Sequence, residues 1–276
     1  MTSGKKARAR RQHARAAPPP VRRRRGRAQA SARPAAPQQR GARRASPKVL
    51  IGALAGLVVI GAIIGAVVAL TGGKSSPKPP SALPGAAAVR RMFAGIPQNA
   101  NVLGSPGAPV TLVEYIDVQC PYCQIFETKA LPKLLTKYVR PGKVKIEARP
   151  IVAIGPDSAT GQAALIAAGE QNHLFDVAEL LYLNQGQENT GWLTTDTVER
   201  AAASFPSIDY APFVSALSSS AVAAQGSKFG DLATNDAISR TPTFYVARNG
   251  ATPREVVLRA PDNPVELDQA IAQALR

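Results

Sequence analysis

The pattern of apolar and polar positions predicts the elements of one folded domain in the C-terminal part of the chain. Residues 111–117 are rich in apolar and β-branched side chains, which is typical of a central buried strand. Residues 144–148 alternate between apolar and charged side chains and predict a second strand. Between them, apolar residues recur at helical spacing from 125 to 138. The order strand, helix, strand predicts a crossover between parallel strands.

The same kind of pattern predicts the remaining helices and strands of the domain. An Ala- and Leu-rich stretch over 157–236 predicts several helices, one of which starts near Asp196 with Glu199 as its capping partner. Two further strands flank Asn249-Gly250, a strong hairpin signal, and Asn263 is expected to cap a last helix. The pattern therefore predicts an α/β fold with a helical insertion.

A run of 22 residues over 49–70 contains only Val, Leu, Ile, Ala and Gly. At about 1.5 Å per residue, a helix of this length crosses the hydrocarbon core of a bilayer. Cleaved signal peptides carry apolar stretches of only about 7–15 residues. We therefore expect an uncleaved transmembrane signal anchor, and cleavage near Ala69 is the minor alternative.

Residues 1–48 carry sixteen Lys and Arg and no acidic residue. The positive-inside rule predicts that they are cytoplasmic and that everything after residue 70 lies outside the cell membrane. The segment has too few large apolar residues to form a core, so we predict a disordered basic tail. Its charge would attract anionic lipid headgroups. It has no aromatic residue for base stacking, so no specific nucleic-acid function is expected.

Residues 71–94 begin with a Gly-, Ser- and Pro-rich stretch and are predicted to form a linker. Residues 95–276 then form one domain of ordinary size, with the helical insertion over about 155–238. From residue 49 onward, eighteen basic residues balance eighteen acidic ones. The folded part is therefore neutral overall, and the basic character of the chain belongs to its tail.

The chain has only two cysteines, Cys120 and Cys123, in the sequence Cys-Pro-Tyr-Cys. A pair at this spacing can close and reopen a small disulfide, which suits redox exchange. The alternatives are half of a zinc site and two incidental buried thiols. Zinc needs about four ligands, and the only histidines, His13 and His173, are not at ligand spacing. No metal or nucleotide cofactor is expected beyond the redox-active cysteine pair.

The predicted helix begins at Pro121, a favoured residue for the first helical position. Cys120 would then lie where free backbone N–H groups and the positive end of the helix dipole stabilise a thiolate. We therefore predict that Cys120 engages the substrate. Cys123, one turn later and expected to be more buried, would resolve the mixed disulfide.

Two motifs together resemble the DsbA-like branch of the thioredoxin-fold proteins. The first is Leu-Val-Glu-Tyr over 112–115, followed by Cys-Pro-Tyr-Cys, and the second is Thr-Pro-Thr-Phe over 241–244. A helical insertion separates them. The resemblance covers most of residues 95–276 and implies a thioredoxin-like fold and thiol–disulfide oxidoreductase activity. It implies nothing about the basic tail.

The resemblance also implies roles for single residues. Pro242 would be a cis-proline that faces the active-site disulfide, and the backbone at Thr241 would bond an extended substrate segment. The alternative for this pair is a plain edge-strand proline. Glu114 would be a buried acid beneath the cysteines that exchanges a proton with Cys123. Its alternative is a partly exposed strand carboxylate.

Pro121 and Tyr122 complete the set of substrate-contacting residues that we predict together with Thr241. Two departures from the family pattern affect this region. Tyr122 replaces the histidine of the most oxidising relatives, which leaves the redox poise open. Asn235-Asp236 and Arg240 stand where many relatives carry glycines near the proline loop, so this surface is expected to differ.

These expectations combine into a membrane-anchored, extracytoplasmic thiol–disulfide oxidoreductase that acts mainly as an oxidase of unfolded or thiol-bearing secreted proteins. The resemblance implies a quinone-linked membrane reoxidase of the DsbB or VKOR type as its partner. A reductase or isomerase of the same fold is the first alternative, although residues 71–94 are too short and polar for a dimerisation domain like that of related isomerases. A membrane-tethered binding or assembly factor with incidental cysteines is the second.

Overall fold

The computed structural model describes residues 77–276. The predicted tail over 1–48, the apolar run over 49–70 and the start of the predicted linker lie outside these residues. Across the described part of the chain, no helix is both long enough and apolar enough to cross a membrane. All of the described residues belong to one unit.

The described residues are built around a six-stranded mixed sheet in the order β1-β2-β4-β3-β5-β6. Only β3 and β4 are parallel, and every other neighbouring pair is antiparallel. The strands are β1 (Gln98–Asn99), β2 (Val102–Leu103), β3 (Val110–Ile116), β4 (Val144–Pro150), β5 (Thr243–Arg248) and β6 (Arg254–Val256). The predicted parallel pair and the hairpin after it are confirmed. The two-residue strands β1 and β2 are too short to leave a periodic signal and were not predicted.

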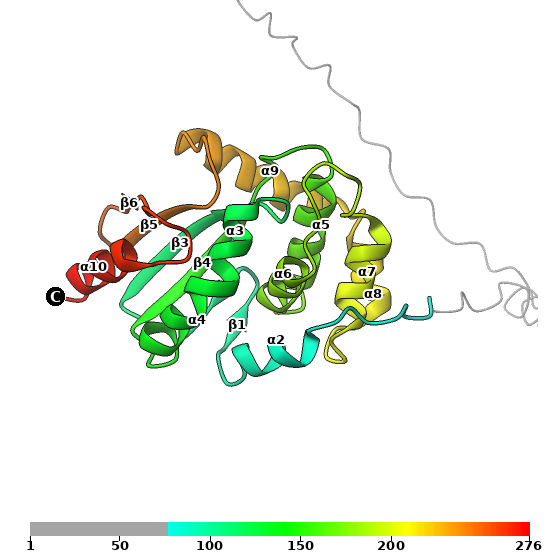
Figure 1. Ribbon diagram of the computed structural model, residues 1–276, viewed down its shortest axis with the longest axis horizontal. Coiled ribbons are helices and arrows are strands. Elements are labelled where there is room, and N and C mark those ends of the chain that lie inside the picture. The colour runs from blue at the N-terminus through cyan, green and yellow to red at the C-terminus, as the bar shows by residue number, and fades with distance from the viewer. Residues whose placement is uncertain (1–76) are drawn as a thin grey trace, which may run out of the picture. The chain divides into compact units, whose positions relative to one another are not determined.

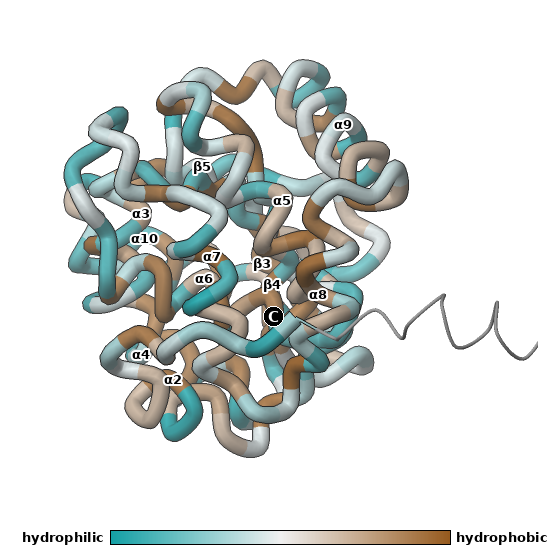
Figure 2. The backbone as a smooth tube through the Cα atoms, turned by 90° about the vertical axis from the view of Figure 1, so that its right-hand side faces the viewer, coloured by the Kyte–Doolittle hydropathy of each residue, from teal (hydrophilic) through white to brown (hydrophobic). Residues whose placement is uncertain are grey.

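The two central strands show the burial that their sequences predict. Every residue of β3 except Thr111 is buried, because neighbouring strands and helices cover both of its faces. β4 alternates strictly between buried and partly exposed residues. Figure 2 shows the apolar segments around β3 and β4 inside the molecule and the hydrophilic segments mostly on its peripheral loops.

A helical insertion between β4 and β5 is also confirmed. It contains α5 (Ser158–Gly169), α6 (Leu174–Leu183), α7 (Thr195–Ala203), α8 (Tyr210–Ala216) and α9 (Ser220–Asn235). Figure 1 shows α5 to α8 grouped to one side of the sheet. The last helix, α10 (Val265–Ala274), packs against β5 and β6. This arrangement is the mixed α/β thioredoxin-like fold with a helical insertion that the sequence predicts.

The helix after the cysteines switches from α-helical to π-helical hydrogen bonding twice. It consists of α3 (Pro121–Ile125), η1 (Phe126–Ala130), α4 (Leu131–Leu134) and η2 (Leu135–Val139), and the two η segments have π-helical bonding. The Leu131 N–H donates to the Phe126 carbonyl, five residues back. Pro132 has no N–H to donate, so an irregular turn next to it is the expected response of the helix.

The predicted linker over 71–94 extends less far than expected. Its last part forms α2 (Ala86–Phe93), in which Val89 and Phe93 are buried. The N–H of Leu83 also donates to Ser204 Oγ at 2.8 Å. Apolar residues recur here at nearly helical spacing and give the chain a face to bury against α6. The Gly- and Pro-rich composition nearby hides this short pattern.

Two predicted helix caps are wrong by one or two residues. Helix α7 is capped by Thr194, whose Oγ1 accepts from the Thr197 N–H at 3.2 Å, and not by Asp196. Glu199 accepts instead from the Tyr210 hydroxyl at 2.7 Å. Helix α10 has Pro264 rather than Asn263 at its N-cap and has no side-chain capping bond. Neighbouring Thr, Asp and Asn residues are all acceptable caps, so only the backbone geometry selects among them.

We predict that Thr194→Ala lowers the free energy of unfolding by about 1 kcal/mol, the usual cost of losing an N-cap. Asp196→Ala removes only a favourable charge from the first turn of α7 and should cost less, roughly 0.3–1 kcal/mol. Urea denaturation of both variants measures the difference. An equal or larger loss for Asp196→Ala would contradict the assignment of Thr194 as the cap.

Candidate active site

Cys120 lies at the junction between the buried strand β3 and the first turn of α3. Its N–H donates to the Asp117 carbonyl at 3.0 Å, and its own backbone is extended. Pro121 follows as the first helical residue, as the sequence predicts. Cys120 and Cys123 are both present as free thiols, and both are buried. The thiol of Cys120 is thus held at the start of a helix.

The surroundings of Cys120 lower the pKa of its thiol from 9.0 to about 6. The largest cause is a hydrogen bond from the Cys123 thiol, which favours the Cys120 thiolate. Burial acts in the opposite direction. The Thr241 side chain and the backbone N–H groups of Cys123 and Tyr122 add to the lowering. The helix start thus helps to lower the Cys120 pKa, as predicted, but the hydrogen bond from the Cys123 sulfur lowers it most.

The loop that carries Pro242 faces Cys120. The peptide bond between Thr241 and Pro242 is cis, and the Cys120 thiol donates to the Thr241 carbonyl at 3.1 Å. Thr241 Oγ1 is buried and has no partner. An ionised sulfur cannot donate to the carbonyl, whereas it can accept from this hydroxyl. Thr241 therefore offers an acceptor to the thiol and a donor to the thiolate.

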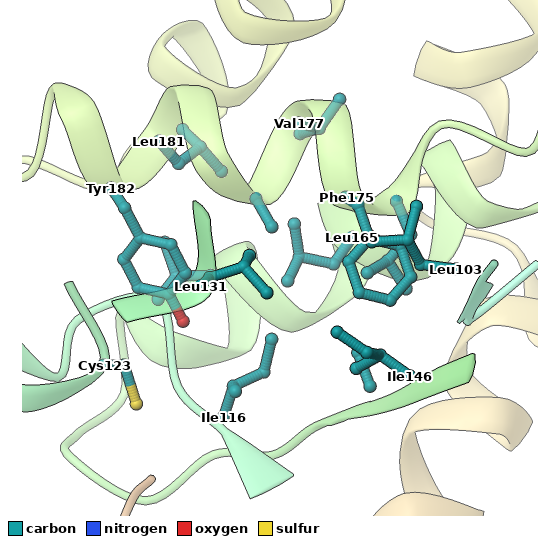
Figure 3. Packing of buried hydrophobic residues seen from close by; sticks show 14 of the residues in the cluster. Leu103, Ile116, Cys123, Leu131, Ile146, Leu165, Phe175, Val177, Leu181 and Tyr182 are labelled. Atoms are coloured by element: carbon teal, nitrogen blue, oxygen red, sulfur yellow. The ribbon is translucent and has the colours of Figure 1, made fainter. Parts of the chain in front are cut away.

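Cys123 differs from Cys120 in ionisation rather than in exposure. Both residues are almost fully buried, with 0% and 1% of their surface exposed, so the predicted difference in exposure is not found. Burial instead raises the pKa of Cys123 well above its ordinary value, and the adjacent Cys120 sulfur raises it further. Figure 3 shows Cys123 at the edge of the buried cluster, and Tyr182 is close enough for the charge of Cys123 to raise its pKa. The contrast in pKa therefore comes from burial of the Cys123 sulfur and from the hydrogen bonds that the Cys120 sulfur receives.

Three buried carboxyls lie behind the cysteines. Glu114 on β3 is completely buried, neither of its carboxyl oxygens has a hydrogen-bond partner, and burial raises its pKa to about 8. Glu127 on η1 and Glu179 on α6 are also buried. Burial and the charges of the other two carboxyls raise the pKa of Glu127 well above its usual range, and burial raises that of Glu179 to about 7. The charge of Glu127 also acts on Cys123.

The sequence analysis missed Glu127 and Glu179. Glu127 follows Cys123 by four residues, a spacing that places two residues on one face of a helix, so helical periodicity could have found it. Glu179 comes from the insertion, and no local pattern relates it to the cysteines. Only the packing of α6 against η1 brings it there.

Buried polar residues hold the turn between β3 and α3, and these were missed as well. The Asp117 carboxylate accepts from the N–H groups of Gln119, Ala153 and Ile154 at 2.8 to 2.9 Å. The Gln185 side-chain amide donates to the carbonyls of Val118 and Cys120. Further bonds from the insertion reach Gln119 through Ser158 and Asn189 and the Asp117 carbonyl through Tyr182. The helical insertion therefore fixes the position of Cys120.

A groove of about 280 Å³ lies next to the cysteines. Tyr122, Thr241 and Pro242 line it, together with apolar residues of β5, of β6 and of the segment after β6. Tyr122 is 60% exposed, which is unusual for a large aromatic side chain. Pro121, predicted as a substrate contact, is not among the lining residues. Within residues 77–276, no group of three or more His, Cys, Asp or Glu side chains could hold a metal ion.

Comparisons with known proteins agree with this geometry. A family model described as "Thioredoxin" matches residues 98–255. The "Probable disulfide bond formation protein D" of Bacillus cereus is 30% identical over 154 residues, which cover 55% of this chain and 71% of the relative. The "Disulfide bond formation protein D" of Bacillus subtilis is 30% identical over 150 residues, which cover 52% of this chain and 66% of the relative.

Solved structures show the same fold. Oxidised BdbD from Bacillus subtilis matches with a TM-score of 0.56 and 24% identity, over 72% of this chain and 99% of that chain. The α-DsbA1 of Wolbachia pipientis matches with a TM-score of 0.54 and 17% identity, over 66% and 92% of the two chains. The fold and the paired cysteines define the class of thioredoxin-like redox proteins. The chain belongs to the thioredoxin family, in its DsbA-like branch, and is a thiol–disulfide oxidoreductase.

We predict that the thiolate absorbance of the reduced protein near 240 nm rises with a midpoint close to pH 6, and that Cys120→Ser removes this transition. Cys123→Ala removes the thiol donor that lowers the Cys120 pKa most and supplies no other donor, so its midpoint should move up toward 9. An unchanged midpoint in Cys123→Ala would contradict the role of the Cys123 thiol.

The same pKa shift predicts how stability depends on pH. Because the folded pKa of Cys120 lies near 6 and its ordinary value is 9.0, the reduced protein binds fewer protons than its unfolded form between these limits. The contribution of Cys120 is therefore complete above pH 9 and is lost as the pH falls through 6. The difference in the free energy of unfolding between the wild type and Cys120→Ser, measured at each pH, isolates this contribution. The buried carboxyls titrate in both proteins and therefore cancel in the difference.

Proposed function

We propose that this protein is a disulfide oxidase, anchored in the cell membrane by residues 49–70, that introduces disulfides into secreted proteins outside the cytoplasm. The observation that carries the proposal is the lowered pKa of Cys120 beside the raised pKa of Cys123. A stabilised thiolate favours the reduced pair, and a pair that favours its reduced form is a strong oxidant of other thiols. The names of the Bacillus relatives, which refer to disulfide bond formation, support the same direction.

The reaction proposed for Cys120 and Cys123 proceeds in two exchanges. A substrate thiolate attacks Cys120 Sγ of the disulfide form, so the bond between the cysteines breaks and Cys123 leaves as a thiolate. A second substrate thiolate attacks the substrate sulfur of the mixed disulfide and displaces Cys120 as a thiolate. The substrate loses two electrons and gains a disulfide, and the cysteine pair holds the two electrons. We propose that a quinone-linked membrane reoxidase of the DsbB or VKOR type removes them.

The substrate is proposed to be an unfolded segment with free thiols, bound in the groove beside Tyr122. The backbone at Thr241 would pair with an extended chain, and the apolar wall of the groove would take a side chain next to the substrate cysteine. Pro242 is proposed to keep this loop against the cysteines. The basic tail over 1–48 is proposed to lie in the cytoplasm and to contact anionic lipid headgroups.

Glu114 is proposed to give a proton to Cys123 when that sulfur leaves. A thiolate in this buried site is unfavourable, as the raised pKa of Cys123 indicates. Glu114 is neutral below about pH 8 and can donate, and Glu127 lies within electrostatic reach of both groups. The buried carboxyls would thus store the proton that the exchange needs.

The reduction potential of the Cys120–Cys123 pair tests the direction of the reaction. We expect a value on the order of −120 mV, as for strong oxidants of this kind, after equilibration of the full chain with glutathione buffers. A value near −270 mV, on the order of that of thioredoxin, would overturn the oxidase assignment and favour a reductase. A redox-inactive reference is the double variant Cys120→Ser/Cys123→Ser.

Reduction of the oxidised protein by dithiothreitol tests Glu114. We predict that Glu114→Gln slows this reaction at pH 7 by roughly tenfold or more, since general acid catalysis is typically worth about 10²–10⁴-fold and Glu127 can supply part of it. In the wild type, the rate per dithiol thiolate should fall as the pH rises through about 8, because Glu114 loses its proton.

Glu170, an exposed acid just beyond α5, offers the matched control variant Glu170→Gln. It should behave as the wild type. If Glu114→Gln keeps both the rate and the decline near pH 8, Glu114 is not the proton donor, although the redox role of the cysteines would stand.

A further inference from the structure

A compact polar network connects the end of α9 to the sheet. The Tyr115 hydroxyl donates to Asp236 Oδ2 at 2.5 Å and accepts from Arg149 Nη1 at 2.6 Å. Arg149 Nη1 also lies 3.5 Å from Asp236 Oδ2, and Arg149 Nε lies 2.8 Å from Glu147 Oε1. We call Asp236, Tyr115 and Arg149 the Asp236 latch. Asp236 and Arg240, which belong to the second departure noted in the sequence, begin and end the short segment between α9 and Thr241.

The partners of Asp236 are rigid. Tyr115 on β3 pairs in register with Arg149 on β4 and with Thr243 on β5, so both partners of Asp236 lie on the central strands of the sheet. The Arg149 guanidinium lies 5.2 Å from the centre of the Tyr115 ring, and Tyr245 packs edge-on against that ring at 6.3 Å. The Tyr245 hydroxyl also donates to the Asp236 carbonyl at 3.3 Å.

Tyr115 and Arg149 keep their donor groups across the neutral range. Tyr115 has no exposed surface, and burial together with the Asp236 bond raises the pKa of its hydroxyl to about 12. The hydroxyl therefore stays a donor to the carboxylate, and the Arg149 pKa is raised by its bonds to Glu147 and Tyr115. Hydrogen bonds to charged groups are stronger than neutral ones, which matters because the Asp236 side chain is 38% exposed.

The latch residues lie close in the chain to both Thr241 and Cys120. Asp236 ends α9, and Thr241 follows only five residues later. On the far side of Thr241, the Thr243 hydroxyl donates to the Arg240 carbonyl at 2.7 Å, and Thr243 pairs with Tyr115. Tyr115 itself precedes Cys120 by five residues along β3 and the turn after it. One tyrosine is thereby connected to both sides of the contact between Cys120 and Thr241.

We propose that Asp236, Tyr115 and Arg149 are positioning residues that hold Thr241 against Cys120 and so set the reactivity of the Cys120 sulfur. None of the three contacts Cys120 in the described structure; they act through the loop over 237–241. The proposal rests on the proposed function only in that Cys120 is the reacting sulfur. It does not depend on whether the protein oxidises or reduces its substrates.

The test is the titration of Cys120 in reduced full-length protein with the latch opened. Asp236→Ala should raise the midpoint by about half a unit to one unit, because the side chain of a displaced Thr241 no longer lowers the Cys120 pKa through a hydrogen bond. Asp236→Asn keeps an acceptor for the Tyr115 hydroxyl, so its midpoint should lie close to that of the wild type. Asp231→Ala, a change at an exposed acid on the same helix, should leave the midpoint unchanged.

Tyr115→Phe provides a second, independent opening of the latch, because it keeps the buried ring and removes only the hydroxyl. It should raise the Cys120 midpoint in the same direction as Asp236→Ala. If both variants lower Tm and leave the midpoint at its wild-type value, the latch only stabilises the fold and the proposal is wrong. A potential near that of thioredoxin would overturn the oxidase assignment without affecting this result.

Discussion

The confinement of one sulfur atom is the constraint on which the rest of this structure depends. Cys120 Sγ lies at the start of a helix, receives the Cys123 thiol on one side and meets the Thr241 backbone at 3.1 Å on the other. The first two contacts come from the first turn of α3 and the third from the proline loop, 121 residues later, so a small displacement of that loop relative to the helix would remove the third. The strand β3, buried along nearly its whole length, supplies the rigid base for this arrangement.

The buried carboxyls behind the cysteines work against the stability of the fold. Glu114, Glu127 and Glu179 each have a side-chain oxygen that is buried without a hydrogen-bond partner. Unpaired buried polar groups are costly, and apolar residues of similar size would pack at least as well. Perturbed carboxyls of this kind gather where proton transfer is needed. A cysteine pair whose inner thiol must gain and lose a proton in a dry environment is such a place.

The helical insertion does more than enlarge the domain. Tyr182, Gln185 and Asn189 from the insertion bond to the turn that carries Cys120, and Glu179 joins the carboxyls behind it. At the other end of the insertion, Asp236 connects α9 to the sheet just before the proline loop. The insertion therefore borders the redox site from two directions. Its packing affects the cysteines even though it contains neither of them.

The sequence by itself determined the order strand, helix, strand, helical insertion, hairpin and last helix, the position of Cys120 at a helix start and the pair Thr241–Pro242, because local periodicity, helix signals and short motifs carry that information. It did not determine the caps at Thr194 and Pro264 or the end of the linker, where several residues satisfy the same local rule. Only the tertiary structure decided that both cysteines are almost fully buried and that Glu179 lies near Glu127. These features come from packing between segments far apart in the chain, and burial and electrostatic contacts follow from that packing rather than from any local pattern.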